Sequence, residues 1–521
     1  MSTPGLTFPF GPGATTVAED GRIVSVLADP AELPSYLTGG GGVIATLAGR
    51  TVEWSTPTVA ADVDEVEFGY GSAGELRLMV RHAFTTGWGV RIVLTNPSDA
   101  ELELSSCVLT WEPRLDHPAW VLAAGVTGAM AIQPPGGIGP LLGGRLTMGT
   151  CAAAGPEGLE FGPISLGPGG RYVVAWQWDW YRTARAFDQG SAPSVPRRFY
   201  LPVDQAVAIA SDPDEAVIAD GVHLEPVRGQ LELSSAVAGR FEIAVNSARG
   251  VTRYDLDWVD PRDDMLEAAA AEAMAQPTSG AGLVRLADVD AALVVQWAVI
   301  RGSFAHPYPA EDALEVFAAD LADTETADPR LAGFLCGEFE RTGQGELLEL
   351  ATDWLLRTST AQPGVGLAGA RICLSRILTD RPVAAVTDHL ARLARTPPTG
   401  RSLLDQAAVL ELDLLTMARP ASRADLRRVT TTLTAVGPWL GAGLKGRAVR
   451  PLGPDALAYL AAVLALTSEE VSTSMRPRWG TSARELGEDA LAEALAGLTG
   501  QPARPAHGWL VLGGPAADDG G

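Results

Sequence analysis

The segment VTRYDLDWVDPRDDMLEAAAAEAM, residues 251–274, marks a change in the hydrophobic period of this chain. Up to Trp258, apolar residues mostly alternate with polar ones, as in strands that have one buried face. From Met265 onward they recur three and four residues apart, as on one face of a helix. The chain is therefore predicted to consist of an all-β half followed by an all-α half.

The join between the halves carries a helix-entry signal. Asp260 offers a capping oxygen, and Pro261 follows at a position where a missing N–H costs nothing. Asp263 and Asp264 then fall in the first helical turn, where negative charge suits the helix dipole. We predict a β-sandwich domain over residues 1–260, a helical domain over 261–505, and a short strand with a disordered tail over 506–521.

Size and charge narrow the classes of partner. A chain of 521 residues is too long for one core, and its formal net charge is -24. An acidic surface repels phosphate backbones and anionic lipids, so nucleic-acid and membrane partners are disfavoured. No apolar run is long enough to span a bilayer, and the N-terminus lacks a leader pattern, so a cytoplasmic protein is expected. Heavy use of Ala, Arg, Gly and Pro is typical of a GC-rich bacterial genome.

Side chains that bind metals or form redox pairs are sparse. The chain has four cysteines, two in each half, with no Cys-x-x-Cys, so each is predicted to be a reduced apolar residue. The six histidines are scattered, without paired metal spacing, and no Gly-x-Ser-x-Gly occurs. We therefore expect no metal and no other cofactor.

In the β half, apolar and polar residues alternate along short segments, and Gly- and Pro-rich turns separate these segments. The clearest hairpin is predicted from Val90 to Thr110, where Leu102 and Leu104 alternate with glutamates. A similar alternation sets Phe241, Ile243 and Val245 against Glu242. Over about 250 residues this pattern is typical of a large antiparallel β-sandwich, and two smaller sandwiches are the alternative.

Two aromatic segments of the β half are candidates for sugar contacts. Trp176, Trp178 and Trp180 share one face of a predicted strand, and pyranose rings pack well on flat indoles. The alternative is that the three indoles belong to the sandwich core, where aromatic residues supply much of the buried area. The second segment, residues 111–120, carries Glu112 and His117 between two tryptophans, as in a loop that lines a cleft. A solvated turn is its alternative.

The glycine-rich stretch of residues 133–144 superficially suggests phosphate binding. It lacks the Gly-Lys-Ser/Thr ending of a P-loop and does not open a helix. We interpret it as a mobile loop.

The α half is predicted to be a series of helical hairpins, because its joins are short and contain Pro or Gly. No repeat of fixed length occurs, so a regular solenoid is not supported. The preferred arrangement is a closed ring of hairpins, an α/α toroid. An irregular helical-hairpin domain is the alternative.

Three acidic residues of the α half fall on apolar helix faces. Asp290 lies inside the apolar arc of a helix predicted over residues 283–300, and Glu338 lies in the middle of the arc of residues 331–340. Glu411 sits in a helix, residues 403–417, that is apolar almost all round. A carboxylate in such a place is costly unless it is paired or faces a cavity, and cavity carboxylates serve as acids and bases. The alternative is an arginine partner for each: Arg285, Arg301 or Arg341 for the first two, and Arg401 for the third.

A large antiparallel sandwich, an acidic linker and then a helical ring resembles the six-hairpin glycosidase architecture. Glucoamylase-like hydrolases and inverting disaccharide phosphorylases share this plan, and some polysaccharide lyases use its parts in the other order. The resemblance covers most of the chain in element order, without a matching motif. The helical half is short for a complete ring.

The resemblance implies a carbohydrate-active protein, a glycoside hydrolase or phosphorylase that uses paired carboxylates. Glu338 is then the general acid, Asp290 the base and Glu411 the substitute. Trp297, one and a half turns beyond Asp290, borders the same space. The further sugar contacts expected from the β side are Trp176, Trp178, Trp180, Glu112 and His117.

Three alternatives remain. The first is a non-catalytic glycan-binding or scaffold protein of the same architecture, which the lack of a dense acidic and aromatic motif favours. The second is an epimerase of the mutarotase kind in the β half, with His82 or His117 and Glu112 or Glu225 as acid and base. The third, an isoprenoid cyclase, is disfavoured because no Asp-x-Asp-Asp or aspartate-rich motif occurs.

Overall fold

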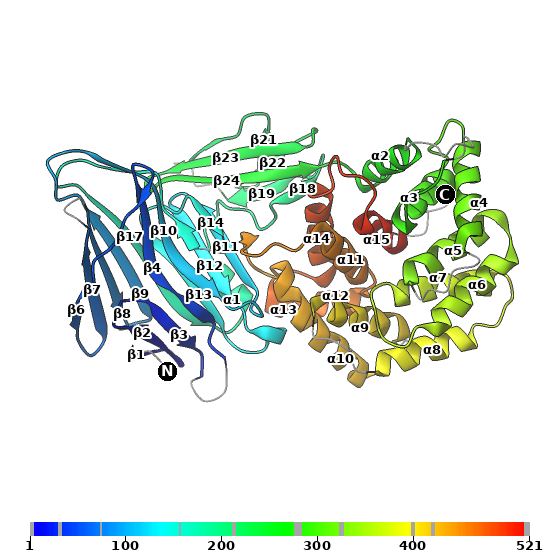
Figure 1. The fold of residues 1–521 in the computed structure, drawn as a ribbon, viewed down its shortest axis with the longest axis horizontal. Helices are drawn as coiled ribbons and strands as arrows, with labels where there is room; N and C mark the ends of the chain where they lie inside the picture. The colour runs from blue at the N-terminus through cyan, green and yellow to red at the C-terminus, as the bar shows by residue number, and fades with distance from the viewer. Residues whose placement is uncertain are drawn as a thin grey trace.

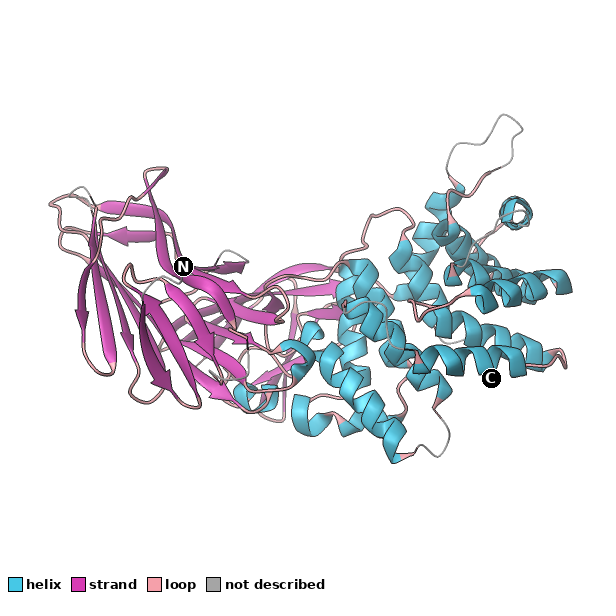
Figure 2. Ribbon diagram, turned by 60° about the horizontal axis from the view of Figure 1, so that its bottom comes forward, coloured by secondary structure: helices cyan, strands magenta, loops and turns pink. Residues whose placement is uncertain are grey.

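The computed structural model describes residues 5–29, 34–72, 76–155, 158–210, 215–275, 284–321, 328–396, 402–417 and 422–514. The molecule is elongated, with strands gathered at one end and helices at the other (Figures 1 and 2). The last long strand ends at Val259 and the first long helix begins at Arg262. The predicted fold, a large antiparallel β part followed by a helical-hairpin part, is confirmed.

The larger β unit is a sandwich of two antiparallel sheets. The described residues of the first form nine strands in the order β25 (Arg447–Ala448), β11 (Ala119–Ala124), β12 (Thr127–Ile132), β13 (Leu141–Met148), β17 (Arg171–Tyr181), β9 (Trp88–Thr95), β8 (Arg77–Ala83), β7 (Glu65–Gly71) and β6 (Thr58–Ala61). The second contains β14 (Ala153–Gly155), β15 (Gly158–Glu160), β10 (Leu102–Pro113), β4 (Leu37–Leu47), β5 (Arg50–Thr51) and β16 (Ile164–Leu166). A small sheet of β1 (Gly5–Phe10), β2 (Gly13–Ala18) and β3 (Ile23–Leu27) adjoins them.

The predicted hairpin of residues 90–110 is wrong in its pairing, although both of its strands exist. Strand β9 pairs with β8 and β17, whereas β10 pairs with β4, β15 and β16 of the other sheet. The side chain of Asn96 holds the corner by donating to the carbonyl oxygens of Ala100 and Leu166. The connection therefore crosses between sheets, because alternation specifies which face is buried but not which strand lies alongside.

The second β unit is smaller, and its core is continuous with apolar residues of β11 and β12 of the sandwich. One of its sheets contains β18 (Tyr200–Pro202), β24 (Gly250–Val259), β23 (Gly239–Ser247) and β20 (Ala216–Ile218), and the other β19 (Val207–Ala210), β22 (Gln230–Ser234) and β21 (His223–Val227). A short helix, α1 (Ala184–Asp188), precedes it. The unit lies between the sandwich and the helices (Figure 1).

The helical half forms a ring. Its described helices are α2 (Arg262–Met274), α3 (Val289–Arg301), α4 (Tyr308–Leu321), α5 (Pro329–Thr342), α6 (Gly345–Arg357), α7 (Val365–Leu378), α8 (Ala384–Arg395), α9 (Leu403–Thr416), α10 (Arg423–Val436), α11 (Pro454–Ala465), α12 (Glu469–Ser474), α13 (Arg476–Trp479), α14 (Ala483–Ala496) and α15 (Pro505–Gly513). Helices α3, α5, α7, α9 and α11 each contact the next, and α15 contacts both α11 and α3. The cycle of inner helices is thereby closed.

Helix α15 corrects the prediction for the end of the chain. Residues 507–514 were expected to form a short strand, but Pro505–Gly513 is helical and completes the ring. An apolar run this short fits either structure, and packing against α3 and α11 decides for the helix. The expected tail, residues 515–521, lies outside the described residues. The helical domain therefore extends beyond the predicted end at residue 505.

Helix α15 also packs against other inner helices of the ring. Besides α3 and α11 it contacts α5 and α7. A Cβ added to Gly364 would lie 2.5 Å from the Trp509 ring, and one added to Gly333 would lie 2.7 Å from the Leu512 side chain. These glycines let α15 approach the other inner helices closely. Trp509 of α15 thereby packs between α5, the start of α7 and α11, beside Arg330 and Tyr459.

The two halves meet along a polar and aromatic seam. Strand β25, from the helical half of the sequence, pairs with β11 of the sandwich. The Trp120 indole N–H donates to the Pro438 carbonyl oxygen over 2.9 Å, and the ring packs against Gly441. Gly441 adopts a φ of 66°, and any Cβ there would lie 2.8 Å from that ring. Glycine at this position thus permits both the turn and the contact.

Candidate functional site

Asp290 lies in the first turn of α3 and is paired. Both of its carboxylate oxygens accept from Arg330 Nη1, over 3.0 and 2.9 Å. Asp290 is 3% exposed. Burial raises the pKa of its carboxyl to about 6, although the charge of Arg330 acts to lower it. Helix α15 covers it through Gly508. The partner is therefore an arginine that the sequence analysis did not name.

Glu338 lies on α5 and is 1% exposed. Its carboxylate accepts from Gln296 Nε2 over 2.7 Å and from Arg341 Nη2 over 2.7 Å. Arg341 was among the expected partners. Glu338 is thus held in the paired state that the sequence analysis gave as the alternative to catalysis.

Glu411, on α9, is fully buried. Its oxygens accept from the backbone N–H of Gly364 over 2.9 Å and of Leu367 over 2.6 Å, at the start of α7, and from the Tyr459 hydroxyl. Burial raises the pKa of this carboxyl to about 6, while those hydrogen bonds act in the opposite sense. The expected partner Arg401 lies outside the described residues.

Each of these three carboxylates is bonded to protein donors. None of the three residues lines a cleft of the described structure. Their catalytic roles stay predictions, and the geometry supports the alternative that each stabilises the ring. Trp297 is partly buried near them on α3, with the Arg301 guanidinium 5.4 Å from its ring centroid.

The three tryptophans of β17, Trp176, Trp178 and Trp180, differ in how far they are buried. Trp176 and Trp178 are 1% and 0% exposed and belong to the sandwich core, as the alternative interpretation has it. Trp180 is only partly buried and lines an open cleft beside α13.

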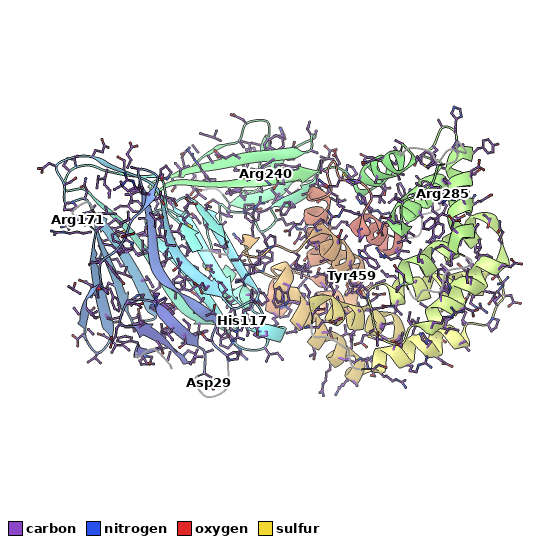
Figure 3. The ribbon with its side chains drawn as sticks, viewed as in Figure 1. Asp29, His117, Arg171, Arg240, Arg285 and Tyr459 are labelled. Atoms are coloured by element: carbon purple, nitrogen blue, oxygen red, sulfur yellow. The ribbon has the colours of Figure 1, made fainter. Side chains whose placement is uncertain are left out.

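Glu112 and His117 also differ in how far their side chains are exposed. Glu112 is exposed at the end of β10, whereas His117 is 1% exposed and its Nδ1 lies 2.9 Å from Asp116 Oδ1. Burial lowers the pKa of His117, which favours the neutral ring. Figure 3 places this histidine at the sandwich edge nearest the helices.

A polar cleft lies between the sandwich and the second β unit, and we call it the junction cleft. Its volume is about 760 Å³. The floor is made by β11 and β14, and the charged wall by β23, β24 and β25. The charged residues in its lining are Arg240, Glu242, Arg253, Asp255 and Arg447.

Strand register explains the charged wall. Arg240 lies opposite Asp257, Glu242 opposite Asp255, and Ala244 opposite Arg253, so these residues share one face of the β23–β24 hairpin. The other face buries Ile243 and Val245. Figure 3 shows Arg240 on this hairpin, next to the sandwich. The alternation seen in the sequence correctly gave the buried face, and the wet face is the one that lines the cleft.

Arg447 joins the two β units and the helical half. Its Nη1 donates to the Tyr200 hydroxyl over 2.7 Å, and its Nη2 donates to Asp257 Oδ2 over 2.9 Å. The guanidinium carbon also lies 4.9 Å from the Tyr200 ring centroid. Gly446 precedes it with a φ of 121°, where a Cβ would clash with the Val121 carbonyl oxygen. The local sequence therefore lets β25 dock and points Arg447 into the cleft.

A narrow pocket of about 50 Å³ continues from the junction cleft toward α14 and shares Phe199, Gly446 and Arg447 with it. Asp489 and Glu493 of α14 line this inner pocket, as does Tyr200. Burial raises the pKa of Glu493 to about 7; Asp489 adds to the rise and Arg447 opposes it. Burial likewise raises the pKa of Asp489 to about 6, although Arg198 Nε lies 2.7 Å from its carboxylate.

The arrangement brings together what proton-transfer chemistry on an anionic ligand requires. Guanidinium groups face the space where a ligand fits, and a carboxyl that titrates near neutral pH lies beside a tyrosine hydroxyl. Burial raises the pKa of Tyr200 more than Arg447 lowers it, so the phenol keeps its proton. Domain interfaces are common places for such sites.

Sequence reasoning missed these residues for an identifiable reason. Arg198 and Tyr200 share one segment, whereas Arg240, Arg447 and Glu493 come from three others, and none of the four segments contains a motif. The weak signal was the charged face of residues 240–257, which ordinary solvation of a strand explains equally well.

No family model matches this sequence, and a search of curated proteins finds no match. A solved structure described as a polysaccharide lyase matches with a TM-score of 0.71, over 95% of this chain and 93% of that chain. The sequence identity is 11%, so the likeness shows a shared fold. Within the described residues, no helix is both long and apolar enough to cross a bilayer.

Proposed function

We propose that this protein is carbohydrate-active and that it binds an anionic polysaccharide in the junction cleft. The observation that carries the proposal is the set of arginines, Arg240, Arg253 and Arg447, that face one large cleft of a strongly acidic chain. Guanidinium groups match carboxylates and sulfates in geometry and charge. The polysaccharide lyase with the same fold supports a glycan as the ligand.

Elimination is the reaction to test first. A base removes the proton from the carbon that carries a sugar carboxylate, the bond to the neighbouring glycosidic oxygen breaks, and a carbon–carbon double bond forms. The departing oxygen takes a proton from an acid. Arginines stabilise the charge that develops on the carboxylate.

Side chains of the inner pocket suit both proton transfers. Glu493, with its pKa near 7, exchanges a proton readily at neutral pH, and Tyr200 retains a proton that it can give to the oxygen. Arg447 touches Tyr200 directly and lines both spaces, so it connects the binding cleft with these groups.

Hydrolysis or phosphorolysis by paired carboxylates is the finer prediction that competes with elimination. It needs an acid and a base on either side of a glycosidic bond. Asp290, Glu338 and Glu411 are the residues predicted for it, and each is at most 3% exposed and occupied by protein donors. Because these carboxylates cannot reach a glycosidic bond, their environment argues against hydrolysis by this pair and leaves elimination in the junction cleft as the reaction to test.

Binding without turnover is the second candidate function, and one observation favours it. Asp257 already bonds two of the three cleft arginines, Arg240 over 2.8 Å and Arg447 over 2.9 Å. These charges are partly compensated within the protein, whereas Arg253 is exposed and has no ion-pair partner among the described residues. A ligand anion would therefore meet Arg253 first.

The test is to incubate the purified protein with a panel of polyuronates, sulfated glycans and neutral glucans. Ultraviolet absorbance of the new double bond reports elimination, and reducing ends without that absorbance report hydrolysis. Repeating the incubation with added phosphate tests phosphorolysis. Binding of anionic polymers without either product supports the binding protein. Absence of binding to every anionic polymer contradicts the proposal.

Three variants assign the site. Glu493→Gln and Tyr200→Phe are expected to lower elimination by about a hundredfold or more, as removal of an acid or base usually does. Glu346→Gln, at an exposed position of α6 far from the site residues in the sequence, is the control and keeps full activity. Loss of activity in Glu338→Gln, with Glu493→Gln unaffected, would instead support the ring carboxylates.

A further inference from the structure

A second cleft crosses the seam between the halves, away from the hairpin that lines the junction cleft. It has a volume of about 890 Å³ and no lining residue in common with the junction cleft. Its walls are the segment Ile138–Pro140 and the N-terminal residues of α13, and the end of β17 with the residues after it forms the floor. We call it the Trp180 cleft. Its lining residues are Pro12, Ile138, Gly139, Pro140, Trp180, Tyr181, Arg182, Thr183, Pro477 and Arg478.

Trp180 is held rigidly at the floor of this cleft. Its indole N–H donates to the Phe10 carbonyl oxygen over 3.2 Å, its ring stacks on Phe10 at 5.3 Å, and the Tyr36 ring meets it edge-on at 5.1 Å. Gly11 and Gly13 pack against the same ring. A fixed aromatic surface costs little conformational entropy when a ligand packs on it.

Charge in this cleft opposes that of the whole chain. Arg182 and Arg478 line it, and none of its lining residues is Asp or Glu, although the chain carries a formal net charge of -24. Arg182 is exposed, and within the described residues its side chain makes no hydrogen bond or ion pair. Arg478 donates one hydrogen bond to the Gly137 carbonyl oxygen. At least the first of these guanidinium groups is available to an anion.

Two physical features therefore select the ligand class. The flat indole of Trp180 suits the C–H face of a sugar, and the unpaired guanidinium group of Arg182 suits a carboxylate or sulfate. A neutral glucan satisfies the first feature alone, and an inorganic anion only the second. An anionic oligosaccharide satisfies both.

We propose that the Trp180 cleft is a second binding site for a stretch of anionic glycan, separate from the junction cleft. The proposal rests on the proposed function for the identity of the polymer, because the same glycan is taken to occupy both clefts. The glycine-rich stretch of residues 133–144, interpreted from sequence as a mobile loop, forms one wall through Ile138–Pro140, and its last four residues belong to strand β13 instead.

The test measures binding of an oligouronate, and of a neutral oligoglucan of equal length, by titration calorimetry. Arg182→Glu is compared with Arg185→Glu, an exposed arginine of α1 outside the cleft lining, so that the net charge changes equally. Both variants are made in an Arg253→Glu background, which weakens the junction cleft. Arg182→Glu is expected to weaken oligouronate binding about tenfold relative to Arg185→Glu. Trp180→Ala should weaken it as well, while Trp180→Phe keeps most of it.

Hydrogen exchange with bound oligouronate locates the site independently of activity. Protection of residues 137–141 and 476–480 supports the proposal, even if no polymer is ever cleaved and the proposed reaction fails. Equal binding by Arg182→Glu and Arg185→Glu overturns it, even if elimination in the junction cleft is established. Equal affinity for the neutral oligoglucan also overturns it, as does the absence of oligouronate binding in the Arg253→Glu background.

Discussion

Two groups of acidic residues in this protein are both removed from bulk solvent, but only one of them lines a pocket that a ligand could reach. In the ring, Glu338 and Glu411 are at most 1% exposed, and protein donors occupy their oxygens. At the junction, Asp489 and Glu493 are only partly buried and line a pocket that opens toward a large cleft. Burial raises the pKa of Glu411 and of Glu493 alike, so a raised pKa does not by itself mark a reactive group. Access to a ligand separates the two groups.

The largest expected effect is on the ring. Replacing Glu411 by Ala leaves the N–H groups of Gly364 and Leu367 and the Tyr459 hydroxyl without a buried acceptor. The free energy of unfolding should fall by about 3–5 kcal/mol, measured by urea denaturation. Glu411→Gln should cost less, since its amide oxygen still accepts. Glu346→Ala, at an exposed position on α6, is the control. A small loss in Glu411→Ala would break the comparison.

Glu338→Ala should have the next largest effect. It strips Gln296 Nε2 and Arg341 of a buried partner. Arg341 is 13% exposed and can regain some water, so a loss of about 2–3 kcal/mol is expected. The thermal midpoint of unfolding reports it. Unchanged stability combined with lost activity would move Glu338 into the reactive group.

Asp489→Asn should sharpen the assignment at the junction. The Asp489 carboxylate helps to raise the pKa of Glu493, so removing its charge lowers that pKa. If Glu493 is the base, the pH at which activity reaches half its maximum should move to lower pH. Glu346→Gln removes an exposed charge on α6, outside this cluster, and serves as the control. A profile that does not move assigns the titration to another group.

A further effect is expected on stability as a function of pH. The folded state raises the pKa of Glu493 from 4.5 to about 7, so it binds this proton more tightly than the unfolded chain does. Stability is therefore lost as the pH rises from about 4.5 to about 7, and no further change follows above that range.

Glu493→Gln should reduce this loss, leaving the contributions of Asp290, Glu411 and Asp489 in place. Denaturation at about pH 5 and about pH 7.5 measures the difference. An identical pH slope in both proteins would show that Glu493 is not buried as described.

The errors of sequence interpretation have a common physical origin. Strands β9 and β10 were located correctly but paired wrongly, because alternation describes a single strand and pairing is a contact between distant segments. The run of residues 507–514 was expected to be a strand, and only its neighbours α3 and α11 make it a helix. Local pattern was informative wherever local forces dominate.

The candidate carboxylates show the same limit. Helical periodicity placed Asp290, Glu338 and Glu411 on apolar faces, and all three are indeed buried. Periodicity cannot tell whether an apolar face meets a cavity or another helix. Contacts between helices decide that question: α15 covers Asp290 through Gly508 and packs Trp509 against Tyr459, the partner of Glu411.

Local patterns in the sequence correctly predicted a β half followed by an α half and the buried faces of most elements. These follow from side-chain periodicity, which each segment carries within itself. Only the tertiary structure brought Tyr200, Arg240, Arg447 and Glu493 to one seam. That assembly depends on contacts between distant segments, such as the hydrogen bond between Arg447 and Tyr200, which are 247 residues apart, and no local pattern encodes them.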